Sequence, residues 1–154
     1  MAELASIIGA EPFLRKLQPG QIEKLAALAR RVGFPAGARL FEEGGNAHEF
    51  WLIAAGRVAL DALIPGQGRV TIETLGRGDV VGLSWLTAPY QYRYGAICLQ
   101  PVQAFEFDAK AVRAACDSDP ALGYALLDRF LAVAALRLQA TRARLLESRP
   151  VATP

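Results

Sequence analysis

The spacing of apolar residues changes along the chain and separates helical from β-like regions. Ile22, Leu25 and Leu28 recur at helical spacing and are continued by Val32. This period predicts a helix over residues 21–32. A break in the chain is expected before it at Pro19-Gly20, because proline and glycine commonly punctuate regular structure.

Short apolar runs replace the helical period in the middle of the chain. They cover residues 39–41, 50–54, 57–64, 70–75, 95–99 and 102–107. The sequence Pro65-Gly66-Gln67-Gly68 reads as a turn between two of them. Strands this short and closely spaced predict a sandwich or barrel, of which a β-roll is one form.

Helical spacing returns after Asp108, which is a suitable N-cap for a short helix over residues 109–116. Asp119 followed by Pro120 begins a second helix, expected to run to about Ser148, on the order of 40 Å. Its apolar stripe contains Leu126, Phe130 and Val133.

The predicted fold is therefore α+β. It comprises N-terminal helices, an antiparallel β-roll of the jelly-roll or double-stranded β-helix type over about 33–108, and a long C-terminal helix over about 119–148. Residues 1–149 are expected to form one domain, with 150–154 as a tail. A length of 154 residues with 53% apolar content is consistent with one domain that has a sizeable core.

Charge and hydropathy exclude several classes of protein. With 17 basic and 15 acidic residues, the net charge of +2 does not suggest a strongly basic nucleic-acid surface. No apolar run approaches the ~18–20 residues that span a bilayer. The N-terminus, Met1-Ala2-Glu3-Leu4, lacks the positive region of a secretory signal, so we expect a cytoplasmic protein without membrane association.

The residues that most often carry chemistry are sparse. Cys98 and Cys116 form no clustered metal pattern and are expected to be structural, and the lone histidine, His48, is expected at the surface. Ser84 has no plausible base to activate it. The sequence therefore predicts no metal site, no cofactor and no enzymatic activity.

Two glycine-rich stretches carry a resemblance to a known family. Residues 43–58, Glu-Gly-Gly-Asn-Ala-His-Glu-Phe-Trp-Leu-Ile-Ala-Ala-Gly-Arg-Val, are followed by residues 75–82, Leu-Gly-Arg-Gly-Asp-Val-Val-Gly. Together they resemble the cyclic-nucleotide-binding domain of the catabolite-activator family, over roughly residues 13–146. The chain looks like a divergent, stand-alone member. Only five residues follow Arg149, so no attached DNA-reading domain and no specific DNA binding are expected.

The resemblance also implies a ligand site, the phosphate-binding cassette. In the family a Gly-Glu pair opens a short helix, and an Arg followed by Ser or Thr contacts the phosphate. Here Gly82 matches the glycine and Leu83 stands where the ribose-binding Glu is expected. Either Arg93 or Tyr92 occupies the phosphate-contact position. The candidate ligand-binding residues are Gly82, Leu83, Ser84, Trp85, Tyr92, Arg93 and Tyr94.

Two interpretations of this altered cassette remain open. The aromatic side chains could stack on a flat, anionic, nucleotide-like ligand with Arg93 facing the anion, or they could fill a pocket that no longer binds anything. The first predicts a non-catalytic ligand-sensing module acting through protein partners. The alternatives are a structural dimerisation protein and a partner of full-length DNA-binding regulators. A homodimer is expected through the C-terminal helix, at Leu126, Phe130 and Val133.

Overall fold

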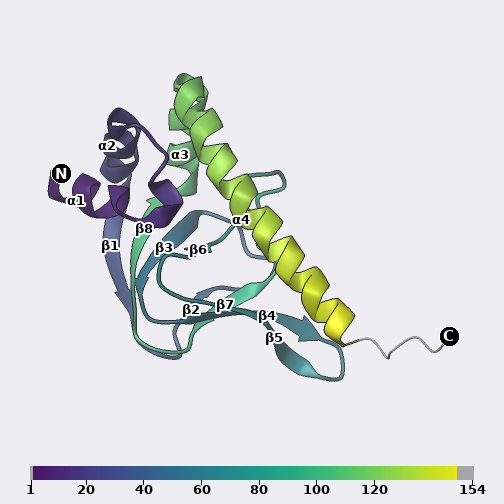
Figure 1. The fold of residues 1–154 in the computed structure, drawn as a ribbon. Helices are drawn as coiled ribbons and strands as arrows, with labels where there is room; N and C mark the ends of the chain where they lie inside the picture. Colours follow the sequence, from purple (N-terminus) through teal and green to yellow (C-terminus); the bar gives the residue numbers. More distant parts are fainter. Residues whose placement is uncertain (1, 149–154) are drawn as a thin grey trace.

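Two antiparallel four-stranded sheets form the centre of the fold in the computed structural model, which describes residues 2–148 (Figure 1). The strands are β1 (Ala29–Phe34), β2 (Arg39–Phe41), β3 (Glu49–Ala55), β4 (Val58–Ile64), β5 (Gly68–Leu75), β6 (Val80–Val81), β7 (Gly95–Cys98) and β8 (Val102–Asp108). One sheet has the order β1-β8-β3-β6 and the other β2-β7-β4-β5. The predicted α+β fold with an antiparallel β-roll is confirmed.

The first strand was not anticipated. The helix predicted over residues 21–32 ends at Ala27, and Ala29–Phe34 forms β1 instead. Along its whole length β1 pairs with β8, where Arg30 Nε donates to Glu106 Oε1 at 2.8 Å. Pairing with a distant strand thus overrides the local helical period, because it provides hydrogen-bond partners for the backbone groups of β1.

Three short helical segments precede the sheets: α1 (Ala2–Gly9), the 3₁₀ helix η1 (Pro12–Leu14) and α2 (Pro19–Ala27). The Pro19-Gly20 pair, expected as a break, is instead the first turn of α2, where proline lacks only an N–H that would be unpaired anyway. The Gln21 side chain accepts a hydrogen bond from the Gln18 backbone N–H at 2.9 Å. An ion pair between Lys24 and Asp119 links α2 to the start of the last helix.

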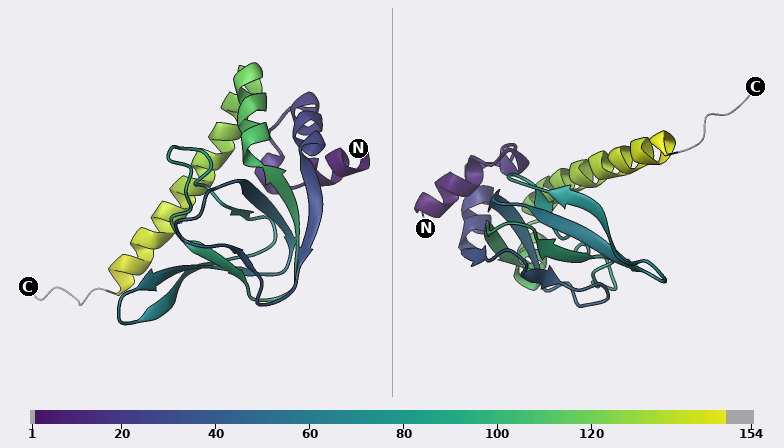
Figure 2. Two further views of the ribbon diagram at one scale, coloured as in Figure 1. Left: turned by 180° about the vertical axis from the view of Figure 1, so that it is seen from behind. Right: turned by 90° about the horizontal axis from the view of Figure 1, so that it is seen from below.

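The chain ends in two helices, α3 (Ala109–Ser118) and α4 (Pro120–Glu147). Asp108 caps α3 by accepting from the Ala111 N–H at 3.0 Å, and Asp119 caps α4 through the Leu122 N–H at 3.3 Å. From its start beside α3, α4 runs diagonally past the two sheets toward the β4–β5 hairpin (Figures 1 and 2). The predicted domain end at Arg149 and the tail of residues 150–154 lie outside the described residues.

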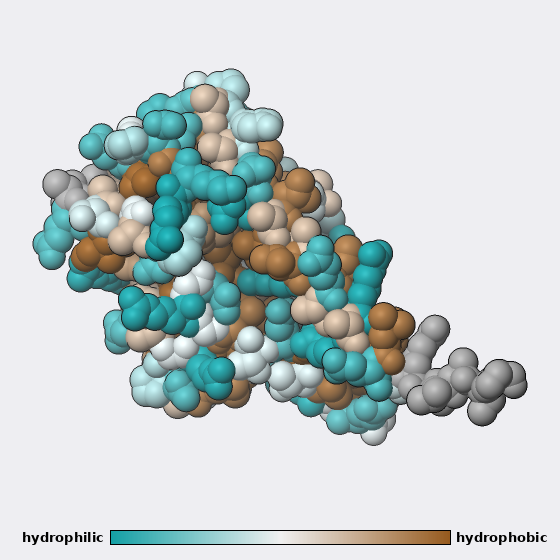
Figure 3. Space-filling model, viewed as in Figure 1, coloured by the Kyte–Doolittle hydropathy of each residue, from teal (hydrophilic) through white to brown (hydrophobic). Residues whose placement is uncertain are grey.

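The two faces of α4 have different surroundings. Leu126 and Phe130 are fully buried and Val133 packs against the same core. These three residues, where we expected the dimer contact, therefore pack within the chain instead. Other apolar residues of α4 are exposed, and apolar positions recur along this helix in the space-filling view (Figure 3). They are Tyr124, Leu127, Leu131, Leu136, Leu138, Leu145 and Leu146.

Aromatic rings join the helices to the sheets. Phe50 of β3 stacks on Phe107 of β8, with ring centroids 4.7 Å apart, and meets Phe130 of α4 edge-on at 5.4 Å. Phe13 of η1 approaches Phe130 edge-on at 5.0 Å. One continuous core thus sets the position of α4 on the roll.

None of the helices within residues 2–148 combines the length and the hydrophobicity needed to cross a membrane.

Candidate functional site

A cavity of about 450 Å³ lies between the β2-β7-β4-β5 sheet, α4 and the loop of residues 82–94, which we call the cassette loop. The strands contribute Phe41, Leu60, Ile72 and Glu73; the cassette loop contributes Gly82, Leu83, Ser84, Thr87, Pro89, Gln91, Tyr92, Arg93 and Tyr94; and α4 contributes Ala134, Arg137, Leu138 and Thr141. All the ligand-binding residues predicted from the sequence therefore line this cavity, except Trp85.

Gly82 sets the start of the cassette loop. Its φ of 101° lies in the region that favours glycine, and a Cβ at this position would come within 3.4 Å of the Phe50 Cβ. Turns and bends follow Gly82 within the described chain, where the family resemblance implied a short helix. The amides after Gly82 are thus not the N-terminus of a helix, and no helix dipole at this position favours an anion.

Tyr92, one of the two residues matched to the phosphate-contact position, is buried in the cavity lining. Its ring stacks on Phe41 with centroids 3.7 Å apart and planes 5° apart. Its hydroxyl donates to the Glu49 backbone carbonyl at 2.6 Å. Burial raises the pKa of this phenol well above its usual value, so the side chain remains neutral and presents an aromatic surface.

Arg93, the other match, is exposed at the edge of the cavity next to the half-exposed Tyr94. Among residues 2–148, no side-chain hydrogen bond or ion pair engages its guanidinium. Arg93 is therefore available to a ligand, although solvent competes for it.

Trp85 lies in the core. It is 2% exposed, stacks on Phe50 with centroids 4.5 Å apart and meets Phe130 edge-on at 5.2 Å. The stacking surface for a ligand that we expected from Trp85 is thus occupied by the protein. The sequence shows an aromatic residue in the cassette, but it does not show on which side of the loop the ring lies.

Arg113 of α3 holds the outer part of the cassette loop. Its Nη1 donates to the Trp85 carbonyl at 2.8 Å, and its guanidinium lies 4.2 Å from the centre of the Tyr90 ring. The Tyr90 carbonyl accepts from the Ala47 N–H at 2.7 Å. These contacts stabilise Tyr90 at a φ of 56°, which is uncommon for residues other than glycine.

Sequence reasoning missed Arg137, the cation that α4 contributes to the cavity. It is half-buried and donates a hydrogen bond to the Val80 carbonyl. Burial lowers the pKa of its guanidinium, whereas the negative charges of Glu73 and Asp79 act to raise that pKa. The signal was its spacing, because position 137 continues the buried series 126, 130 and 133.

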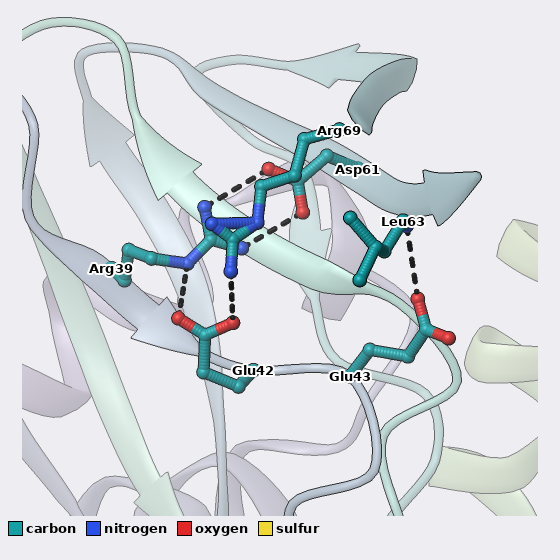
Figure 4. Close-up of polar contacts among 6 residues, drawn as sticks. All are labelled: Arg39, Glu42, Glu43, Asp61, Leu63 and Arg69. Atoms are coloured by element: carbon teal, nitrogen blue, oxygen red, sulfur yellow. Dashed lines mark hydrogen bonds and ion pairs between the residues drawn. The ribbon is translucent and has the colours of Figure 1, made fainter. Parts of the chain in front are cut away.

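A second group of charges joins β2, β4 and β5 (Figure 4). Asp61 accepts from both terminal nitrogens of Arg39, at 2.8 and 3.0 Å, and Glu42 lies between Arg39 and Arg69 at 2.6 and 3.0 Å. Hydrogen bonding to Arg39 lowers the pKa of the Asp61 carboxyl, and the same bond raises that of Arg39. None of these four residues lines the main cavity, so we assign them to stability.

The remaining candidates from the sequence lie apart from one another. Cys98 is buried in β7, Cys116 is partly buried in α3 and His48 is exposed. Burial raises the pKa of both thiols. Within residues 2–148, no three His, Cys, Asp or Glu side chains converge as metal ligands.

Comparison with known proteins identifies the type of domain. Residues 31–119 match the family model of the cyclic nucleotide-binding domain. No curated protein matches the chain significantly in sequence.

Solved structures share the fold over most of the chain. A Geobacter metallireducens protein assigned by name to cyclic nucleotide binding is 25% identical, with a TM-score of 0.79 over 87% of this chain and 97% of its own. A cyclic nucleotide-binding domain from Methylobacillus flagellatus is 20% identical, with a TM-score of 0.81 over 99% and 86%. The N-terminal domain of a transcriptional regulator from Streptomyces coelicolor is 21% identical, with a TM-score of 0.68 over 88% and 94%.

Proposed function

The chain belongs to the cyclic nucleotide-binding domain family, and on that premise we propose that it is a non-catalytic ligand-sensing module with an altered phosphate-binding cassette. The observation that carries the proposal is the cavity of about 450 Å³, which is lined by the cassette loop on one side and by α4 on another. A ligand there would contact both elements. Its binding would change the balance of contacts that position α4, and a protein partner would recognise the result.

The altered residue of the cassette argues against the usual ligands. Leu83 lines the cavity where the family has a carboxylate for the ribose 2′-hydroxyl. A buried hydroxyl without a partner costs about 1–3 kcal/mol. Cyclic AMP and cyclic GMP should therefore bind weakly or not at all, and a flat or apolar anion should be preferred.

Isothermal titration calorimetry with cyclic AMP and cyclic GMP is the first test. Weak or undetectable binding of both is expected. For any anionic ligand that does bind, Arg93→Ala should cost less than the about 1.5–3 kcal/mol of a shielded hydrogen bond to a charged group, because solvent competes for the exposed guanidinium. Tight, saturable binding of a cyclic nucleotide, abolished by Arg93→Ala, would show that the cassette works in the usual way and would refute the altered specificity.

The exposed face of α4 favours a second role, the formation of a homodimer. Tyr124, Leu127 and Leu131 follow the three-and-four spacing of a helix–helix seam, and Leu138, which also lines the main cavity, and Leu145 continue it at intervals of seven; each is at least half exposed. An unpartnered apolar stripe of this kind is suited to a second copy of α4. If no small molecule binds, this surface still supports the alternative of a structural dimerisation protein.

A further inference from the structure

Arg137 stands between two cavities. It lines the main cavity and also a second one of about 350 Å³, which is lined by η1, β5 and α4. Glu73 of β5 is the other charged residue that lines both. The hydrogen bond to the Val80 carbonyl fixes the guanidinium at this position.

The charge of Arg137 has no close counterion within residues 2–148. Its hydrogen-bond partner is a neutral carbonyl, and Glu73 and Asp79 act on it without forming an ion pair within 4.0 Å. Removing a cation from water is costly unless it is paired. A guanidinium has five N–H donors in a planar array, so it can retain its bond to Val80 and offer others to an anion.

The lining of the main cavity specifies the charge of that anion. Arg93 and Arg137 are opposed by Glu73, which leaves one net positive charge. Much of the remaining lining is apolar or aromatic, including Phe41, Leu60 and Ile72. A monoanion with an apolar or aromatic body therefore complements the cavity better than a polyanion or a sugar.

We propose that Arg137, on α4, is the principal anion-binding residue of the main cavity, and that its ligand is an organic monoanion with an apolar or aromatic body. This inference rests on the proposed ligand-sensing function. It moves the anion site from the cassette loop to α4, so that the ligand's charge contacts the long helix directly. Arg93, which is solvent-exposed, then adds only weakly to the binding.

Two probes of nearly equal shape test the inference: 2-naphthoate and its uncharged amide, 2-naphthamide. Titration calorimetry on the full chain should show tighter binding of the carboxylate. Arg137→Gln should weaken carboxylate binding about ten- to a hundredfold and change amide binding little, as expected for a lost hydrogen bond to a charged group. Arg142→Gln, an exposed position on the same helix outside both cavities, is the matched control and should change neither.

Arg137→Lys is a second control, which distinguishes loss of the charge from loss of the fold. It keeps the charge and should retain part of the preference for the carboxylate, and thermal unfolding of each variant checks the fold. Equal binding of acid and amide would overturn the inference. The inference would also be overturned if Arg137→Gln still preferred the carboxylate over the amide while Arg93→Gln lost that preference. In that case the proposed ligand-sensing function would still stand. If the naphthyl probes and the cyclic nucleotides all fail to bind, the proposed function fails as well.

Discussion

The Asp61 carboxylate on β4 accepts hydrogen bonds from both terminal nitrogens of Arg39 on β2, at 2.8 and 3.0 Å. Asp61 is 6% exposed, so this pair is shielded from water. Asp61→Asn should lower the free energy of unfolding by about 1.5–3 kcal/mol, the range for hydrogen bonds to charged groups. Urea unfolding at neutral pH measures the change. Asp128→Asn, at an exposed position of α4, should stay within about 0.5 kcal/mol of wild type.

The same pair predicts a dependence of stability on pH. Because hydrogen bonding to Arg39 lowers the Asp61 pKa in the folded protein, folding favours the ionised form. The contribution is complete above the unfolded pKa of about 3.9 and is lost as the pH falls through the lower folded value. The stability difference between wild type and Asp61→Asn should therefore be constant from about pH 7 to 5 and shrink below about pH 4. A difference that already disappears near pH 6 would contradict this assignment.

Gly95 of β7 provides the space for this ion pair. A Cβ at this position would lie 2.2 Å from Arg39 Nη2 and 2.4 Å from Asp61 Oδ1. Gly95→Ala should destabilise the protein by about 1–3 kcal/mol, as overpacking does. Gly20→Ala is the control, since no atom lies within 4 Å of its Cβ, and a stability gain of about 0.4–1 kcal/mol is expected there. Similar effects of the two substitutions would show that Arg39 and Asp61 adjust freely.

Tyr92→Phe tests whether Tyr92, rather than Arg93, occupies the phosphate-contact position. Losing the hydroxyl removes its bond to the Glu49 carbonyl and should cost about 0.5–1.5 kcal/mol of stability. The aromatic surface remains, so binding of an anionic probe should be unchanged. Tyr94→Phe, at a half-exposed position, should have no effect on stability. A large loss of anion affinity in Tyr92→Phe would assign the anion contact to Tyr92.

Leu131→Lys tests the apolar face of α4. Leu131 is 70% exposed, and a charge in a helix–helix seam opposes association. Light scattering should show dimeric wild-type protein at micromolar concentration and a monomeric variant with the same circular dichroism. Glu147→Lys, an exposed charged position on α4, is the control and should remain dimeric. Monomeric wild-type protein would refute the proposal.

Six of the eight strands described could be predicted closely, because turn residues separate short apolar runs, but the two-residue strand β6 was missed. The runs at 39–41 and 102–107 correspond to β2 and β8 almost residue for residue. The strand β1 could not be predicted in the same way. Val32 continues the helical period of α2, and the strand that pairs with β1 is distant in sequence, as the separation of 76 positions between Arg30 and Glu106 shows.

The sequence indicated an irregular loop after Gly82, but it did not indicate the orientation of the side chains in that loop. Neighbouring residues in an irregular loop have no fixed period, so the sequence does not show that Trp85 lies in the core while Leu83 lines the cavity. On α4 the period is known, but it was not applied to Arg137. Arg137 combines a buried position with a long side chain that reaches the cavity edge.

The packing of Trp85 allows the fluorescence of this tryptophan to report on the position of α4. The indole lies edge-on to Phe130 of α4, and its N–H has no acceptor among the described residues. Trp51, the other tryptophan, stacks on Phe41 and donates to Glu106 at 2.9 Å. Because their surroundings differ, the two tryptophans should be distinguishable by fluorescence. Emission from Trp85, in its apolar surroundings, should be blue-shifted, and its intensity or wavelength should change when α4 moves against the roll, with no dye attached.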